Sequence, residues 1–379
     1  MRPVPIAGVS REVVEALVGA FRRAIRLDRP TVGTEHLLFA LLKGGSAASE
    51  VLAPGVRVSG SLMGVIAAKD EVRWLSEERA DDTASAGDPA VVALLREAEW
   101  LARQKQRPDG EQPSPLLPTG ALAAAIRQAF PHAHERGVSR TNATHLLMGL
   151  LHDPGNRACE ALLEQRLDRD ELVARLAEHP SAHQDGTPHS DAIEGLRNLG
   201  MLDQERGKLW GGLARALSSG GFGSPIVLTV RQEARRGAVR LGHSTVTTVH
   251  LLLAVLALDD QLTSAGLRLR DGLERNNTGA ESLRARGVTL PTALDAATEL
   301  IPADQTEPGS PVPLKLSDGA EQALTRARLS ANARKDPSTG TTHLLGALLA
   351  DPGDPCDTLL TTLGVDTGEL RRTLAHQAP

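Results

Sequence analysis

The sequence predicts an all-α protein. Aromatic residues make up only 2% of its 379 residues and Tyr is absent, so the core must be built from Leu, Val, Ile and Ala. This composition suits helices packed on helices better than a sandwich or barrel, which draws on β-branched and aromatic residues. The second observation is a helix-start sequence that recurs four times. Because a repeat determines the whole architecture, these four copies define the predicted fold.

Each copy contains His-Leu-Leu followed by small and apolar residues. Thr34 and its counterparts can cap the first turn of a helix. Behind the cap, leucines at i, i+1, i+4 and i+5 make one wide apolar face. The copies therefore predict four equivalent buried helices. Their sequences are GTEHLLFALL (33–42), NATHLLMGLL (142–151), TTVHLLLAVL (247–256) and GTTHLLGALL (340–349).

Further helical segments flank each copy. In the second and fourth copies Asp-Pro-Gly ends the helix, and ACEALL or CDTLL begins another. A short final helix is expected at 170–177 and at 368–375. Each repeat is therefore predicted as helix, loop, helix, turn and helix, with almost no strand signal. The helices before the four copies are predicted at 12–27, 122–136, 227–241 and 320–332.

The spacing of the repeats predicts two tandem domains. The first is expected at 1–180 and the second at 225–379. A linker and connector helix are expected at 181–224, where HPSAHQDGTPHSD is polar and rich in turn formers. The repeats are predicted at about 5–70, 118–180, 225–272 and 314–379, with insertions at 81–110, which includes a helix at 90–104, and at 276–311.

A tandem helical repeat carrying Gly-Thr-Glu-His-Leu-Leu, as at 33–38, resembles the N-terminal domain of Clp unfoldases of the ClpA/ClpC class, the Clp repeat domain family. In that family one compact α-helical domain holds two repeats related by pseudo-twofold symmetry. The resemblance implies two such domains in series. The family couples this domain to AAA+ ATPase modules, but this sequence contains no G-x-x-x-x-G-K-[ST] that could cradle phosphates. We therefore expect a binding protein that is not an enzyme.

The resemblance implies a ligand site at Thr34 and Glu35. Family members use this domain to bind adaptors and substrates, in some cases phosphorylated arginine, and it is the target of cyclic peptide antibiotics. Thr144, Val249 and Thr342 stand where the other copies would carry the carboxylate. Because a guanidinium needs a carboxylate for a bidentate bond, at most one such site is expected. The alternative is that Glu35 only favours the helix dipole.

Two phenylalanines that line the antibiotic groove of the family are also replaced. An ungapped comparison places Ile6 and Pro118 at these positions in the first domain, and Gly220 and Leu316 in the second. The resemblance thus implies an aliphatic groove, with Ile6, Pro118 and Leu316 as candidate contacts.

The recurring histidines are expected to be structural. No Cys or carboxylate lies at metal-ligand spacing beside them, and a histidine before buried leucines is more often a hydrogen-bonded structural group. No Ser or Cys recurs beside them as a nucleophile, so a hydrolase on a helical scaffold is a remote alternative. Cys159 and Cys356 are expected to be small buried hydrophobes. The histidines are His36, His145, His250 and His343.

The composition limits the class of partner. A net charge of −5 and a pI near 6.2 argue against a general nucleic-acid binder. Two cysteines are typical of a reduced, intracellular protein, and neither a signal peptide nor a membrane span is expected. The use of Arg over Lys is typical of a high-GC bacterial genome. We expect a cytoplasmic protein with no cofactor and no metal.

These observations predict a binding module of the Clp protease system. It would capture adaptors, substrates or peptide ligands, and one version is a decoy that sequesters a Clp-directed antibiotic for self-resistance. The alternative is a regulatory subunit that docks on a Clp ATPase or peptidase through the inserted segments. Deleting 81–110 would then abolish docking and leave the helical fold intact.

Overall fold

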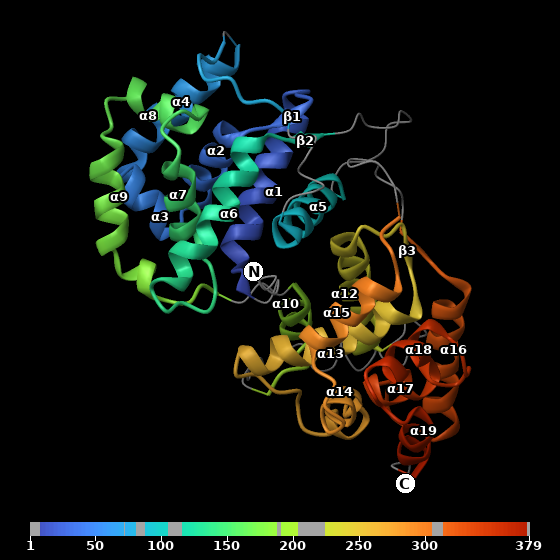
Figure 1. The fold of residues 1–379 in the computed structure, drawn as a ribbon. Coiled ribbons are helices and arrows are strands. Elements are labelled where there is room, and N and C mark those ends of the chain that lie inside the picture. The colour runs from blue at the N-terminus through green and yellow to red at the C-terminus, as the bar shows by residue number, and fades with distance from the viewer. Residues whose placement is uncertain are drawn as a thin grey trace. The chain divides into compact units, whose positions relative to one another are not determined.

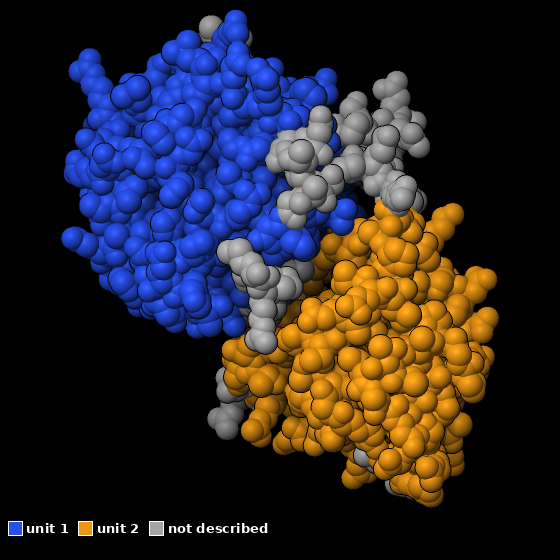
Figure 2. All heavy atoms as spheres, viewed as in Figure 1, with its two compact units in different colours: residues 1–189, 307–311 blue, residues 190–306, 312–379 orange. Residues whose placement is uncertain are grey.

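The chain folds into two compact units, residues 1–189 with 307–311 and residues 190–306 with 312–379 (Figure 2). The computed structural model describes residues 8–71, 73–80, 88–104, 116–187, 191–203, 224–304 and 314–376. These residues are mainly helical, with strands of two residues each, which confirms the all-α prediction. Among the described helices, none has the length and apolar character needed to cross a bilayer.

The first unit is built from two sets of helices that pack in the same way (Figure 1). Strand β1 (Thr31–Val32) pairs in parallel with β2 (Leu117–Pro118), and each strand lies beside the start of a long helix. The helices are α1 (Arg11–Arg26), α2 (Thr34–Gly44), α3 (Ala47–Leu52), α4 (Gly55–Glu71), α5 (Pro89–Arg103), α6 (Gly120–His134), α7 (Ala143–His152), α8 (Arg157–Glu164), α9 (Arg169–Glu178) and the 3-10 helix η3 (Pro180–His183).

The two sets, α1–α4 and α6–α9, exchange partners symmetrically. Helix α1 packs on α2 as α6 packs on α7, α2 contacts α8 as α3 contacts α7, and α4 contacts α8 as α3 contacts α9. The repeated leucines of α2 and α7 all face this shared core, where Leu37, Leu38, Leu146 and Leu147 are fully buried. The wide apolar face that the repeat predicted is therefore what joins the two halves of the unit.

The inserted helix expected at 90–104 is confirmed as α5. It begins after Asp88, whose carboxylate accepts the Ala90 N–H at 2.9 Å. It packs along α1 and buries Val91, Leu94 and Ala98 in the core of the first unit. The insertion thus contributes to the core, and deleting 81–110 would expose it.

The second unit repeats the plan of the first. Strand β3 (Thr245–Val246) pairs in parallel with β4 (Lys315–Leu316). The helices are α10 (Asp191–Asn198), α12 (Pro225–Leu241), α13 (Thr248–Ser264), the 3-10 helix η4 (Glu274–Asn276), α14 (Gly279–Arg284), α15 (Leu290–Leu300), α16 (Asp318–Ala333), α17 (Thr341–Leu348), α18 (Pro355–Thr362) and α19 (Thr367–His376).

The segment expected as an insertion at 276–311 contains two helices of the third repeat. Helix α14 contacts α17 as α3 contacts α7, and α15 contacts α18 as α4 contacts α8. Ala280, Leu283 and Ala297 of these helices lie in the second core. We therefore assign α14 and α15 to the third repeat, whose end moves from residue 272 to residue 300.

Two described parts of the expected linker at 181–224, residues 181–187 and 191–203, pack within the units. Residues 181–187 bond to the first unit, where the Asn142 amide donates to the Ser181 and Gln184 carbonyls at 2.7 and 2.9 Å. In the second unit α10 contacts α12 and α13 and buries Ile193 and Leu196. Residues 181–187 thus belong to the first unit and α10 to the second, although the sequence predicted a linker here.

Candidate functional site

The four recurring histidines close the first turn of their helices. In each repeat the histidine is the third helical residue, and its Nδ1 accepts the backbone N–H of the residue before the helix. Each Nδ1 therefore carries a lone pair, so the ring proton is on Nε2. Burial lowers the pKa of both His36 and His250 to about 3, which keeps these rings neutral. The N–H donors are Gly33, Asn142, Thr247 and Gly340, at 3.0, 3.2, 2.9 and 3.1 Å.

The opposite ring nitrogen separates the first repeat from the other three. His36 Nε2 is buried without a hydrogen-bond partner among the described residues. In the other repeats Nε2 has an acceptor supplied by a nearby segment. These pairs are His145 with the Ala182 carbonyl at 3.0 Å, His250 with His243 Nδ1 at 2.8 Å and His343 with the Asp336 carboxylate at 2.8 Å.

Glu35 is the second residue of α2 and is buried, with 1% of its surface exposed. Its Oε1 accepts from Arg157 Nη1 at 2.9 Å, and Arg157 is the first residue of α8. Its Oε2 has no hydrogen-bond partner among the described residues. Burial and then the carboxylate of Glu78 raise the pKa of Glu35 to about 7, against the opposing effect of Arg157. The carboxylate therefore already binds a guanidinium, and that guanidinium belongs to the protein itself.

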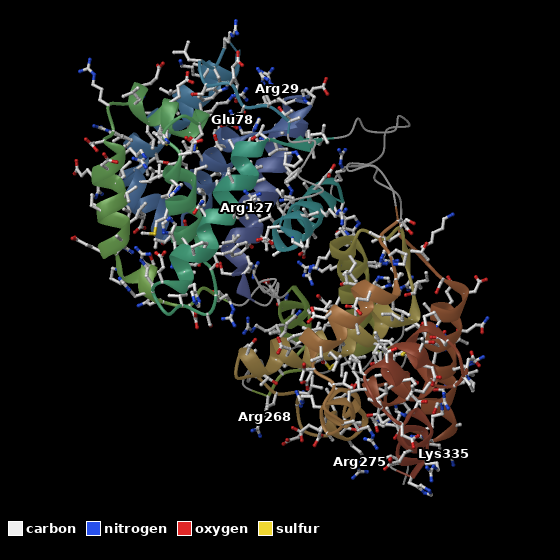
Figure 3. The ribbon with its side chains drawn as sticks, in the orientation of Figure 1. Arg29, Glu78, Arg127, Arg268, Arg275 and Lys335 are labelled. Atoms are coloured by element: carbon white, nitrogen blue, oxygen red, sulfur yellow. The ribbon has the colours of Figure 1, made fainter. Side chains whose placement is uncertain are left out.

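Glu78, labelled in Figure 3, is the central acceptor of this site. The sequence patterns did not identify it. Its carboxylate accepts the Thr34 N–H at 3.0 Å, the Arg157 N–H at 2.9 Å and the Thr119 hydroxyl at 2.9 Å. The Thr34 hydroxyl donates to it as well. These donors come from the N-termini of α2, α6 and α8, where helix dipoles favour negative charge. A single side chain thus fills an anion position shared by three helices.

Glu78 belongs to a segment, residues 73–80, that lies between α4 and α5 and that we call the strap. The N–H groups of Leu75 and Ser76 donate to the Glu160 carboxylate of α8, at 3.0 and 2.7 Å. At the other end Gly120 N–H donates to the Arg79 carbonyl at 3.1 Å. Burial alone would raise the pKa of Glu160, but these N–H groups and Lys69 lower it to about 2. The carboxylate that holds the strap is therefore ionised at neutral pH.

Gly33 allows the two carboxylates to approach. A Cβ built on Gly33 would lie 2.2 Å from Glu35 Oε2 and 2.8 Å from Glu78 Oε2. The φ of −108° at Gly33 is accessible to any residue, so the requirement is for space and not for backbone conformation. The Gly-Thr-Glu sequence at 33–35 thus supplies room, a hydroxyl donor and a buried carboxylate at one point.

The candidate groove residues occupy equivalent places in two repeats. Pro118 in β2 and Leu316 in β4 are half-buried, and each precedes the capping residue of the next long helix. Ile6 lies outside the described residues. In the first repeat the residue before the capping Ser10 is Val9, so Val9 is the structural counterpart of Pro118 and Leu316.

The remaining candidate groups have structural surroundings. Cys159 and Cys356 are buried and unbridged. Burial raises the pKa of Cys159 to about 11 and raises that of Cys356 further, so neither thiol ionises at neutral pH. Among the described residues, no group of three or more His, Cys, Asp or Glu side chains is arranged to hold a metal ion.

Comparison with known families identifies one repeat. Residues 315–379 match the family of the Clp repeat (R) N-terminal domain. This match covers β4 and α16–α19, which is one set of four helices in the second unit. No curated protein matches the chain. The C-terminal repeat is thus similar to Clp N-terminal domains.

Proposed function

We propose that this chain is a non-catalytic binding protein of the Clp proteolytic system that captures peptides, adaptors or substrates in the cytoplasm. The observation that carries the proposal is the Clp repeat matched at 315–379, together with the same four-helix plan in α6–α9. Clp N-terminal domains are binding modules, and a protein made of them acts by recognition. Fold similarity alone does not identify the ligand, so the ligand is argued from the site.

The site at Glu35 favours a ligand that carries a guanidinium beside an anionic group. Glu35 already holds the Arg157 guanidinium, and the neighbouring backbone N–H groups of Thr34 and Arg157 already hold a carboxylate. A phosphoarginine side chain presents the same two charges next to each other. Thr144, Val249 and Thr342 stand at the Glu35 position in the other repeats, so we propose one such site in the chain.

A second class of ligand is a Clp-directed cyclic peptide, which would make the protein a decoy for self-resistance. Pro118 and Leu316 are half-buried and offer aliphatic contacts at the position before the long helices α6 and α16. Two units in one chain would raise the avidity for a bivalent ligand if the connection lets both bind. The stoichiometry of binding separates one competent unit from two.

Calorimetric titration of the full chain tests the proposal. The titrants are a phosphoarginine peptide, a Clp-directed cyclic peptide and a purified Clp adaptor. We expect at least one of them to bind. Glu35→Gln should weaken the binding of the phosphoarginine peptide at least about tenfold. Glu12→Gln is the matched control, because Glu12 is also a first-turn carboxylate, on α1 of the same unit. Absence of binding by all three titrants would refute the proposal.

A regulator that docks on a Clp ATPase through 81–110 is the alternative. Helix α5 in this segment buries Val91, Leu94 and Ala98 against the core, so the described part of the insertion offers little apolar surface to a partner. Deleting the segment would damage the fold and docking together. The structure therefore calls for substitutions at exposed residues as the docking test, such as Pro89 at the start of α5.

A further inference from the structure

We propose that the strap, residues 73–80, is an autoinhibitory segment that binds its own protein as a ligand would and must detach before an external ligand reaches Glu35. The inference concerns the regulation of the site assigned above, and its ligand rests on the proposed function. Four features of the first unit support it, namely the form of the strap, the donors around Glu78, the unsatisfied groups beneath it and the contrast with the other repeats.

The strap has the form of a bound peptide. Its residues belong to no helix, and exposure alternates along it, with Arg73, Leu75 and Glu77 exposed and the residues between them half-buried. Leu75 has 82% of its surface exposed although it is a large apolar residue. Alternation with a period of two is the pattern of an extended chain that presents one face to a surface. The inward face delivers Glu78 to the site.

The inward face is held by polar groups. Glu78 receives N–H and hydroxyl donors from the starts of three helices, and Glu160 receives the Leu75 and Ser76 N–H groups. Arg157 Nε also donates to the Ser76 carbonyl at 3.2 Å. Such charge-assisted bonds are strong but can be replaced by a ligand that offers the same acceptors. A phosphate or carboxylate would satisfy the donors that Glu78 now satisfies.

The groups beneath the strap are incompletely satisfied. Glu35 Oε2 and His36 Nε2 are both buried without hydrogen-bond partners among the described residues, in side chains that are 1% and 2% exposed. Glu35 bonds to the Arg157 guanidinium, whereas Glu78 bonds only to the Arg157 backbone N–H, and the negative charge of Glu78 raises the pKa of Glu35. Leaving a buried polar atom unpaired is unfavourable, and so is bringing like charges together. Both effects offset the bonds of the strap and favour its exchange for a ligand that adds a donor.

Two of the other repeats fill the equivalent position with a side chain that stands at the end of a helix, Asp354 or Asn277. The first helical residue of α13, Thr248, donates to Asp354, which is the capping residue of α18, at 2.6 Å. The Thr341 N–H of α17 donates to the side chain of Asn277, the residue that follows η4, at 2.9 Å. Neither cap has a buried, unpartnered carboxylate oxygen beside it among the described residues. At α2, in contrast, the acceptor Glu78 stands on the strap, which belongs to no helix.

Hydrogen exchange of the full chain tests the inference. The readout is the exchange of the Leu75 and Ser76 amides, in the wild type, in Glu78→Gln and in Glu78→Ala. We expect exchange to be at least about tenfold faster in Glu78→Ala, because the strap loses its anchor. Glu77→Ala is the matched control. Because the Glu77 side chain is exposed, this variant should leave the exchange of the Leu75 and Ser76 amides unchanged. Unchanged exchange in both Glu78 variants would overturn the inference.

Inorganic phosphate serves as the second probe. Glu78→Ala should bind phosphate at least about tenfold more tightly than the wild type, and adding Thr119→Val should reverse the gain, because Thr119 donates to this position. Circular dichroism shows whether Glu78→Ala is folded; if it is not, Glu78→Gln supplies both readouts. Equal phosphate affinity in a folded variant and the wild type would contradict the inference.

The two proposals fail separately. If phosphate binds Glu78→Ala but no Clp ligand binds either protein, the strap inference stands and the proposed function falls. If a Clp ligand binds the wild type at saturation while Leu75 and Ser76 remain protected, the proposed function stands and the strap inference falls.

Discussion

The N-termini of α2 and α17 have the same backbone arrangement, but different side chains accept their first N–H groups, and we call these acceptors the closing groups. Both follow a glycine, and both have a histidine that accepts the glycine N–H. At α17 the closing group is the neutral side chain of Asn277, and His343 has a second partner in Asp336. At α2 the closing group is the carboxylate of Glu78, beside a buried Glu35 and a His36 with an unpartnered nitrogen. The difference is that the α17 N-terminus has a neutral acceptor and a histidine with both ring nitrogens bonded, whereas the α2 N-terminus has two carboxylates and a histidine nitrogen without a partner among the described residues. The binding role that we propose for α2 rests on this contrast.

The largest expected effect comes from the ion pair beneath the strap. Arg157→Met leaves Glu35 buried without a cation and should lower the free energy of unfolding by about 3 kcal/mol at pH 8. At pH 5 the loss should be smaller, because Glu35, whose pKa is raised to about 7, is then protonated. Arg326→Met is the control in the second unit, where the pair with Asp351 is exposed and worth less than about 1 kcal/mol. Chemical denaturation at the two pH values measures both variants, and equal losses would contradict the comparison.

The two glycines should respond unequally to a methyl group. A Cβ on Gly340 would lie 1.9 Å from the Asn276 carbonyl oxygen, which is backbone, so Gly340→Ala should lower stability by about 3 kcal/mol. A Cβ on Gly33 meets the ends of the Glu35 and Glu78 side chains, which can move. Gly33→Ala should therefore lower stability by only about 1 kcal/mol while speeding exchange of the strap amides. Thermal unfolding with hydrogen exchange checks this, and a greater loss in Gly33→Ala would be evidence against it.

Glu35 should make the protein less stable as the pH rises. A carboxyl whose pKa is about 7 in the folded chain and 4.5 as its ordinary value binds its proton more tightly when folded. The stability it contributes is therefore present below about pH 4.5 and is lost as the pH rises to about 7. We expect a loss of about 2 kcal/mol over this range, which Glu35→Gln should remove. Identical pH profiles of the two proteins would show that Glu35 is not perturbed.

The smallest expected effect comes from the histidines. His343→Leu removes bonds to both the Gly340 N–H and Asp336, whereas His36→Leu removes one bond and an unpartnered nitrogen. His343→Leu should therefore lower stability by about 1 kcal/mol more than His36→Leu. Urea denaturation of the two variants measures the difference, and the reverse order would remove this part of the comparison.

The repeated features of the fold were predictable because they are local. The His-Leu-Leu strings give helices α2, α7, α13 and α17, since the apolar face lies within ten residues. The predicted caps Thr34 and Thr341 were wrong, because each is the first helical residue and a glycine, Gly33 or Gly340, occupies the capping position. The extent of the third repeat was not predictable, because α13 has 17 residues where α2 has 11 and the connection to the next α-helix is also longer, residues 265–278 instead of 45–46. A short motif at the start of a helix does not indicate how long that helix or the following connection is.

The candidate site could be predicted only in part. Glu35 was identified from its own motif, but its partner Arg157 lies 122 positions away, and the sequence between gives no periodic signal that joins them. Glu78 stands in a short polar stretch with no helical pattern, and its role depends on three helix N-termini that meet only in the folded unit.

The most direct test of the account is a reconstituted Clp unfoldase and peptidase degrading an adaptor-dependent substrate. The full chain, added in excess over the adaptor, should slow degradation by capturing adaptor or substrate, and Glu35→Gln should slow phosphoarginine-dependent degradation less. Degradation that continues at the same rate with the chain in excess would contradict the claim that this protein binds components of the Clp system.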